Sequence, residues 1–340
     1  MSIADVIDRL LAEEDLGRDG AADALSRIMA GEIDPIQTAA FLIGLRAKGE
    51  SASEIAGLVS AVRDHSTRVT VDHEVFVDTC GTGGGASTFN VSTAAAFVVA
   101  GAGVAVAKHG NRSSTSKSGS ADVLEALGVV VDLPADAVSQ SIDETGIGFM
   151  FAPSFHPAFK HVVPVRRQLA VRTVFNILGP LTNPAGVRHQ VIGIADRTYL
   201  DRIAIAIAEL GTDRTIIVTS DDGLDELSTS SPSEVVEITP DGVRKWRFDP
   251  ADLGIRPPAP GSLAGGEPSE NADVIRRILE GAEGPATDIV AINAAAGLLA
   301  AGTVDDIRDG YDLARSSIEG GQAAERLARF STLTNRLAPT

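Results

Sequence analysis

The spacing of apolar and polar residues divides the chain into two parts. Residues 2–66 carry repeated helix-start signals. The sequence 34–37 supplies an Asp cap, a proline at the first helical position and a Gln three residues after the cap, and Ser51 with Glu54 forms a capping-box pair. Apolar residues then fall on one face of the first predicted helix: Ile36, Ala39, Ala40, Ile43 and Gly44. We therefore expect a small helical domain that serves as scaffold.

From residue 69 onward, short β-prone runs alternate with helical patterns. The runs occupy residues 75–77, 104–107, 129–131, 191–194, 215–219 and 289–292. Such alternation is typical of a parallel or mostly parallel sheet covered by helices. The predicted fold class is therefore α/β, with a small N-terminal helical domain at residues 1–68 and a large α/β domain at residues 69–340.

One stretch, residues 78–128, combines two strand–loop–helix units. In the first, a glycine loop leads into an Ala-rich helix with three candidate caps: Asn90, Ser92 and Thr93. In the second, a polar loop at 108–120 leads into a helix at 121–127. Both loops should emerge at the carboxyl edge of a parallel sheet, where α/β proteins bind ligands. Glycine N–H groups and helix starts there suit phosphate.

Acidic residues are missing from two windows, 79–121 and 145–195, although 46 of the 340 residues are acidic. The windows keep basic residues and histidines: Lys108, Arg112, Lys117, Lys160, Arg166, Arg167, Arg172, Arg188, His109, His156, His161 and His189. Buried strands and glycine loops are often poor in acidic residues, which accounts for one such window. Two windows that retain basic residues favour an anion-binding site.

The formal net charge of −17 argues against nucleic acid or an anionic membrane as a partner, because either would need a broad basic face. A polyanionic substrate must then be held by local groups together with a metal ion. Acidic residues reappear at 221–226, directly after the run 215–219. Carboxylates at the carboxyl end of a strand, opposite phosphate-binding loops, allow Mg²⁺ to bridge protein and pyrophosphate. A solvated acidic turn is the alternative.

The single cysteine, Cys80, excludes an intrachain disulfide and indicates a reducing compartment. It is interpreted as a small buried residue rather than a nucleophile, because the glycine loop supplies no base. The charged N-terminus does not fit a secretory signal, and no apolar run is long enough to span a bilayer. A cytoplasmic protein is predicted.

Phenylalanines gather in the segment 146–186: Phe149, Phe151, Phe155, Phe159 and Phe175. A pocket for a flat ring and ordinary core packing both explain such a cluster. The two interpretations stay open at this point.

Five segments together resemble the anthranilate phosphoribosyltransferase family, which has the nucleoside phosphorylase-like phosphoribosyltransferase fold. They read CGTGG…TFNVSTA from Cys80, VAKHGNRSSTSKSGSADVLEALG from Val106, GIGFMFAPSFHP from Gly146, VRRQLAVRTVFNILGPLTNPAG from Val165 and GLDELS from Gly223. The resemblance covers nearly the whole chain. It implies transfer of the phosphoribosyl group of 5-phosphoribosyl 1-pyrophosphate to the amine of anthranilate, with release of pyrophosphate, in the second step of tryptophan biosynthesis from chorismate.

The resemblance also implies site residues. For phosphoribosyl pyrophosphate they are Gly81, Gly84, Gly85, Thr88, Asn90, Val91, Ser92, Thr93, Lys108, His109, Gly110, Asn111, Arg112, Ser113, Ser114, Thr115, Ser116 and Ser120. For anthranilate they are Gly81, His109, Asn111 and Arg166, whose planar guanidinium can pair with a carboxylate. For two Mg²⁺ ions per monomer they are Ser92, Asp225 and Glu226.

The resemblance further implies a homodimer formed through the amino-terminal helices and a hinge near residues 68–75. It also implies that helices from about residues 156–180 join the helical domain in space. One departure concerns the glycine loop, which commonly reads GTGGDG in the family. This chain is one residue shorter there and has no Asp after Gly84, so the role of that carboxylate is absent or supplied differently.

Two other functions are compatible with this fold. A pyrimidine nucleoside phosphorylase would share the architecture, but its substrates lack pyrophosphate and do not call for the pair Asp225 and Glu226. A non-enzymatic relative that binds a nucleotide or nucleic acid is disfavoured by the net charge of −17 and by Arg166.

Overall fold

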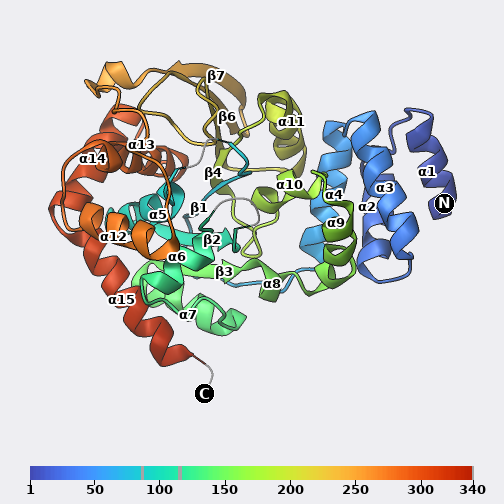
Figure 1. Ribbon diagram of the computed structural model, residues 1–340, viewed down its shortest axis with the longest axis horizontal. Coiled ribbons are helices and arrows are strands. Elements are labelled where there is room, and N and C mark those ends of the chain that lie inside the picture. Colours follow the sequence, from blue (N-terminus) through green and yellow to red (C-terminus); the bar gives the residue numbers. More distant parts are fainter. Residues whose placement is uncertain (86–87, 114–116, 339–340) are drawn as a thin grey trace.

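The computed structural model describes residues 1–85, 88–113 and 117–338 and consists of a helical part and an α/β part (Figure 1). The helical part, blue in Figure 1, lies at one end of the long axis. Its helices are α1 (Ile3–Leu11), α2 (Gly17–Met29), α3 (Pro35–Lys48) and α4 (Ala52–Asp64). A later segment returns to this part, because α9 (Val163–Leu169) packs against α3 and contributes Val165 to the same core.

Both predicted helix starts in this part are confirmed. The Asp34 side chain accepts hydrogen bonds from the backbone N–H groups of Ile36 (2.8 Å) and Gln37 (3.0 Å) at the start of α3. Ser51 and Glu54 form a reciprocal capping box at the start of α4. Each cap satisfies N–H groups that have no partner inside the helix.

The apolar face predicted for α3 is correct for Gly44, which is buried, and for Ala39, which packs against the core, but wrong for the two isoleucines. Ile36 and Ile43 are 83% and 39% exposed, whereas Phe41, Leu42 and Leu45 are buried. The helix carries apolar residues on more than one stripe, and the sequence pattern alone does not say which stripe meets a neighbouring helix. In the structure the stripe with the larger side chains faces the core, so the isoleucines lie on the outer surface.

The α/β part is built on a seven-stranded sheet with the strand order β3-β2-β1-β4-β5-β6-β7. Parallel pairing joins β1 (Phe76–Gly81), β2 (Ala105–Gly110), β3 (Ile147–Phe151), β4 (His189–Gly193) and β5 (Arg214–Ser220). Two antiparallel strands complete the sheet, β6 (Ser233–Thr239) and β7 (Gly242–Phe248). The predicted fold class is confirmed.

Helices cover both faces of the sheet. One face carries α5 (Val91–Gly101), α6 (Ser120–Ala126), α12 (Pro268–Leu279), α13 (Pro285–Ala300), α14 (Ile307–Glu319) and α15 (Gln322–Leu337). The other carries α7 (Ala135–Thr145) and α11 (Leu200–Leu210). The core beneath α11 is continuous with that of the helical part, because Ile192, Ile217 and Val236 belong to the same buried cluster as the residues of α2 and α4.

Short helical turns connect these elements: α8 (Ala152–Phe155), α10 (Phe175–Leu178), η1 (Pro157–His161), η2 (Gly179–Leu181), η3 (Arg197–Tyr199) and η4 (Pro250–Leu253). No helix in the described ranges is both long and apolar enough to cross a membrane.

Some predicted elements differ from the structure. Residues 289–292 lie inside α13, a helix buried over almost its whole length, because a fully apolar run does not distinguish a buried helix from a buried strand. Residues 129–131 form no strand, whereas β3, β6 and β7 were not predicted. Lys108 to Gly110 extend β2 instead of starting the polar loop.

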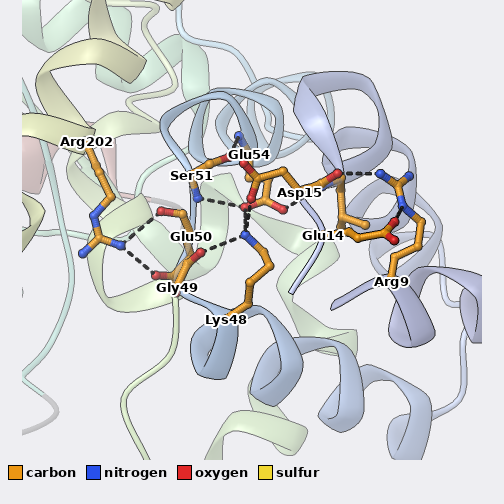
Figure 2. Close-up of polar contacts among 10 residues, drawn as sticks. Arg9, Glu14, Asp15, Lys48, Gly49, Glu50, Ser51, Glu54 and Arg202 are labelled. Atoms are coloured by element: carbon orange, nitrogen blue, oxygen red, sulfur yellow. Dashed lines mark hydrogen bonds and ion pairs between the residues drawn. The ribbon is translucent and has the colours of Figure 1, made fainter. Parts of the chain in front are cut away.

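Figure 2 shows a polar network at the corner between α3 and α4, which ties the helical part to the region of α11. Glu50 at this corner is buried, and its backbone carbonyl accepts a hydrogen bond from Arg202 Nη1 (3.1 Å). The Glu50 carboxylate accepts a hydrogen bond from Tyr199 Oη at 3.3 Å, while its Oε1 has no partner among the described residues. Nearby, Lys48 Nζ lies 2.9 Å from the buried Glu54 carboxylate. Polar contacts thus supplement the shared apolar core.

We expect the free energy of unfolding to depend on the charge of Glu50. Burial raises the pKa of its carboxyl group, so the folded protein holds the proton more tightly than the unfolded chain, and stability decreases as pH rises through that pKa. Glu50→Gln should therefore gain stability relative to the wild type as pH increases from about 4 to 7. Urea unfolding at several pH values measures this, and a relative loss for the variant would show that attraction to Arg202 prevails.

Candidate active site

The carboxyl ends of β1 and β4 are covered by the acidic segment 221–226, and glycines make this approach possible. A Cβ atom at Gly81 would overlap Asp225 Oδ2, and one at Gly193 would overlap the Asp225 backbone carbonyl. A Cβ at Gly85 would overlap the carbonyl of Gly223. The glycine loop and the acidic segment therefore pack backbone against backbone, as their predicted positions at one edge of the sheet required.

Two hydrogen bonds join the glycine loop to the acidic pair. Gly83 N donates to Asp225 Oδ2 at 2.7 Å, and Thr88 Oγ1 donates to Glu226 Oε2 at 3.2 Å. Burial, followed by the charge of Asp225, raises the pKa of Glu226 to about 8. Two adjacent carboxylates in this position favour a cation. Within the described ranges no group of three or more His, Cys, Asp or Glu side chains is placed to hold a metal, so a cation here would need further oxygen ligands from a substrate.

Lys108 supplies a buried positive charge at the same edge. Its Nζ donates to the Thr79 carbonyl and lies 3.5 Å from Ser92 Oγ at the start of α5. Burial has the largest effect on the ammonium group and lowers its pKa. The negative charge of Asp78 acts in the opposite direction. Asp78 is itself fully buried and accepts a hydrogen bond from Asn183 Nδ2 at 2.8 Å. No ion pair of Lys108 with a carboxylate is found among the described residues, so its hydrogen bonds within them go to Thr79 and Ser92.

Asn90 joins the two predicted phosphate loops. It occupies the N-cap position of α5 but makes no capping hydrogen bond with its side chain. Its Nδ2 donates to the Ser118 carbonyl (3.1 Å), and its Oδ1 accepts from Ser118 Oγ (3.0 Å) and Asn271 Nδ2 (2.9 Å). The side chain predicted to contact phosphate or ribose therefore also holds the second loop against the first.

In the second loop, Arg112 is directed to the carboxylates of α6. Its guanidinium lies 2.9 Å from Asp122 and 2.7 Å from Glu125, and these contacts raise the pKa of Arg112. Ser120 Oγ donates to the carbonyl of Asn111 at 3.3 Å. The predicted residues Ser114, Thr115 and Ser116 lie outside the described residues, so the structure gives no position for this part of the loop.

Consecutive residues of β2 point to opposite faces of the sheet, and this separates Lys108 from His109. His109 Nε2 lies 3.1 Å from His156 Nε2. The His156 ring stacks on Phe159 with centroids 4.9 Å apart. Sequence reasoning assigned no role to His156, which only the fold brings beside His109.

Arg166 lies at the end of a row of rings, His156, Phe159 and Phe175, which we call the aromatic wall. Its guanidinium lies over the Phe175 ring, 5.2 Å from the centroid, and Phe175 meets Phe159 edge to face at 5.4 Å. Burial lowers the pKa of Arg166, and its side chain has no hydrogen bond or ion pair with any described residue. Phe149, Phe155 and Phe175 are buried in hydrophobic core clusters, and Phe151 and Phe159 pack against them. Core packing is therefore confirmed for the phenylalanine cluster, and a pocket for a flat ring stays a prediction.

Gly81 and Asn111, the other predicted acceptor residues, lie at the ends of β1 and β2. No hydrogen bond among the described residues links either of them to the aromatic wall. Cys80 is partly buried, and burial raises the pKa of its thiol well above the usual range, which opposes a role as nucleophile.

Comparison with known proteins assigns the chain to a family. Residues 4–66 match the helical bundle domain of a glycosyl transferase family, and residues 73–324 match its a/b domain. The anthranilate phosphoribosyltransferase of Thermomicrobium roseum is 48% identical over 99% of this chain and 98% of its own length. That of Moorella thermoacetica is 49% identical over 94% and 95%. The chain belongs to the anthranilate phosphoribosyltransferase family.

Solved structures agree with this membership. The anthranilate phosphoribosyltransferase of Thermus thermophilus superimposes with a TM-score of 0.91 at 41% identity, over 97% of this chain and 99% of that one. The Saccharomyces cerevisiae enzyme in complex with phosphoribosyl pyrophosphate and Mg gives 0.91 at 29% identity, over 98% of both chains. The same yeast enzyme with 4-fluoroanthranilate gives 0.88 at 28% identity, over 99% of both chains.

We expect both histidines of the wall to stay neutral throughout the range in which the enzyme works. Burial is the main cause that lowers the pKa of His109 to about 3 and that of His156 to about 4. The stability gained from neutral rings is present above the unfolded value of about 6.5 and is lost as pH falls towards the folded values. Ring proton shifts followed by NMR should show no titration between pH 8 and pH 5. A midpoint near 6.5 for either ring would contradict this.

Proposed function

We propose that this chain transfers the phosphoribosyl group of phosphoribosyl pyrophosphate to the amine of anthranilate and releases pyrophosphate, the second step of tryptophan biosynthesis from chorismate. The observation that carries the proposal is the joining of the glycine loop to Asp225 and Glu226 in a chain 48% identical, over nearly its full length, to an anthranilate phosphoribosyltransferase. The reaction breaks a C–O bond to pyrophosphate and forms a C–N bond at the same ribose carbon.

The donor would bind at the edge formed by β1, β2 and the start of α5. Backbone N–H groups of Gly81, Gly84 and Gly85 and the polar groups of residues 88–93 would hold its phosphates and ribose. Lys108 lies buried beneath both loops, so its charge would stabilise the pyrophosphate as negative charge develops on the leaving oxygen. Most of the rate acceleration would come from positioning and from these charges, without a covalent enzyme intermediate.

The residues present fit a divalent cation. Asp225 and Glu226 would hold it together with Ser92, and a bound cation would oppose the burial and the charge of Asp225 that raise the pKa of Glu226 to about 8. Mg²⁺ would neutralise pyrophosphate oxygens and supply electrostatic stabilisation to the leaving group. We propose two such ions per monomer.

The acceptor would bind between the sheet edge and the aromatic wall. Arg166 would pair with the carboxylate of anthranilate through two parallel hydrogen bonds, and the ring would lie near His109, Gly81 and Asn111. The pairing orients the aromatic amine towards the ribose carbon. Neutral His109 and His156 add no positive charge that would repel the oxocarbenium-like centre.

The assembly and location of the protein are part of the proposal. The exposed isoleucines of α3, Ile36 and Ile43, support a homodimer formed through the helical part. We also propose a domain boundary between residues 68 and 69, a hinge at residues 68–75 and a cytoplasmic location. Small-molecule substrates, rather than nucleic acid or membranes, are the expected partners.

The metal assignment predicts a large loss of turnover when the acidic pair is neutralised. The wild type should convert phosphoribosyl pyrophosphate and anthranilate in the presence of Mg²⁺. The combination of Asp225→Asn and Glu226→Gln should lower kcat at least about a hundredfold, the scale on which one preorganised charge-stabilising group acts. Asp221→Asn is the matched control, because Asp221 lies in the same segment but pairs with Arg197 and Arg247. Magnesium titrations of all three proteins give the measurement. Wild-type turnover in the double variant would refute the assignment.

The acceptor assignment predicts a selective effect of Arg166→Ala. The KM for anthranilate should rise about tenfold or more while the KM for the donor changes little, since a charged hydrogen-bonded pair is lost on one side only. Arg167→Ala, which removes the exposed neighbouring arginine, is the control. Steady-state kinetics with each substrate varied in turn measures both constants.

Aniline tests whether the carboxylate is the group that Arg166 recognises. Aniline keeps the amine but lacks the carboxylate, so it should be a poor acceptor for the wild type and should lose little more with Arg166→Ala. The two proteins and two acceptors form a thermodynamic cycle. If Arg166→Ala lowered activity equally with both acceptors, Arg166 would instead bind phosphate or stabilise the fold.

A further inference from the structure

Arg172 lies in the turn between α9 and α10, where the helical part meets the glycine loop. Its backbone carbonyl accepts a hydrogen bond from Arg46 Nη1 on α3, which anchors the turn to the helical part. Its side chain extends to the glycine loop, because a Cβ atom built on Gly84 would lie only 3.0 Å from the Arg172 Cζ atom and 3.1 Å from Nη2. Gly84 has a φ of 83° and no side chain, so the guanidinium lies directly against the loop backbone.

The guanidinium of Arg172 forms no ion pair within the described residues. Its side chain makes no hydrogen bond or ion pair with any residue of the described ranges, and no side chain outside those ranges is acidic. The charge of Arg172 contributes to the lowered pKa of Asp196, but hydrogen bonds from Thr198 are the main cause. Both Thr198 bonds end on Asp196 Oδ1, at 3.1 Å and 2.7 Å, and they fix that carboxylate locally.

The sequence of the glycine loop explains why this arginine is unpaired. The loop has glycine and alanine at positions 84–86, and the acid-free window 79–121 contains the whole loop. Arg172 itself lies in the second acid-free window, 145–195. An exposed cation that lies against a phosphate-type loop, with no carboxylate in either segment, is placed to meet an anion bound by that loop.

We propose that Arg172 contacts the pyrophosphate group of the donor and is a further substrate-binding residue. The inference rests on the proposed function, since it takes phosphoribosyl pyrophosphate as the ligand of the glycine loop. A guanidinium offers two parallel N–H groups to neighbouring phosphate oxygens, which an ammonium group cannot do. Asp225 meets the loop at Gly83, and Arg172 meets it at Gly84.

This assignment gives two arginines of one segment different substrates. Arg166 is half buried, lies over Phe175 and belongs to the aromatic wall. Arg172 is exposed, lies against Gly84 and belongs to the donor side. Kinetic effects of the two residues should therefore separate by substrate.

The experiment compares Arg172→Gln, Arg172→Lys and the control Arg167→Gln. Arg172→Gln should raise the KM for phosphoribosyl pyrophosphate and the inhibition constant of pyrophosphate by about tenfold to a hundredfold, the range for the loss of a hydrogen bond between charged groups. The KM for anthranilate should stay within about twofold. Arg172→Lys should show a smaller loss on the same two constants, because it keeps the charge but not the paired N–H groups. Arg167→Gln should match the wild type.

Binding of pyrophosphate with Mg²⁺, measured by calorimetry, separates this inference from the proposed function. Weaker pyrophosphate binding by Arg172→Gln at an unchanged melting temperature supports the contact even if the wild type fails to convert anthranilate. Unchanged pyrophosphate binding overturns it, as does a selective rise in the KM for anthranilate. A drop in melting temperature with equal losses for both substrates would instead show that Arg172 only supports the loop.

Discussion

The close approach of the Asp225 backbone to the ends of β1 and β4 is the constraint on which the site depends. Parallel strands bring the glycine loop and the acidic segment to one edge, but at position 193 only a residue without a Cβ atom leaves room for the Asp225 backbone, and at position 81 a Cβ atom would meet the Asp225 carboxylate. The contact places two carboxylates beside the glycine loop, whose Gly83 N–H donates to one of them. Attraction for a cation and attraction for phosphate therefore arise at the same place, which is what a magnesium-bound pyrophosphate requires.

A strongly acidic protein holds a polyanion here because its charges are segregated locally. Lys108 is buried beside Thr79 and Ser92, whereas Asp78 is buried with Asn183 on the other face of the sheet. Alternation along β2 then directs Lys108 to the side proposed for the donor and His109 to the side proposed for the acceptor. One strand thus divides the site into a charged half and an aromatic half, and each half suits one substrate.

The sequence predicted those features that follow from local chemistry. Glycines after a strand and the pair Asp225 and Glu226 after another strand predict that these segments meet at one edge of the sheet, and the hydrogen bonds between them confirm this. The sequence did not predict the features that depend on tertiary contact. His156 and Arg172 lie far along the chain from His109 and Gly84, and no local pattern marks them as partners.

A strand was predicted at residues 289–292, which lie in the buried helix α13. This run is apolar throughout, so it shows no alternation of polar and apolar residues that would distinguish a buried strand from a buried helix. The buried stripe of α3 was misassigned in part, at Ile36 and Ile43, because the helix has apolar residues on more than one stripe and only a packing partner decides which stripe is buried. The strands β6 and β7 were missed although both form an antiparallel edge of the sheet. Residues 114–116 lie outside the described residues. The individual substrate contacts stay predictions.

The way in which the helical part is attached limits how such chains can recombine. Its core is continuous with the sheet through α11, Glu50 and Arg202 form a polar joint, and Arg46 holds the backbone of Arg172. The helical bundle and the α/β part look like separable modules along the sequence. Exchange of one of them between two relatives would mismatch all three attachments at once, and it would disturb the turn that carries an arginine to the glycine loop. The two parts should therefore be inherited together, as one evolutionary unit.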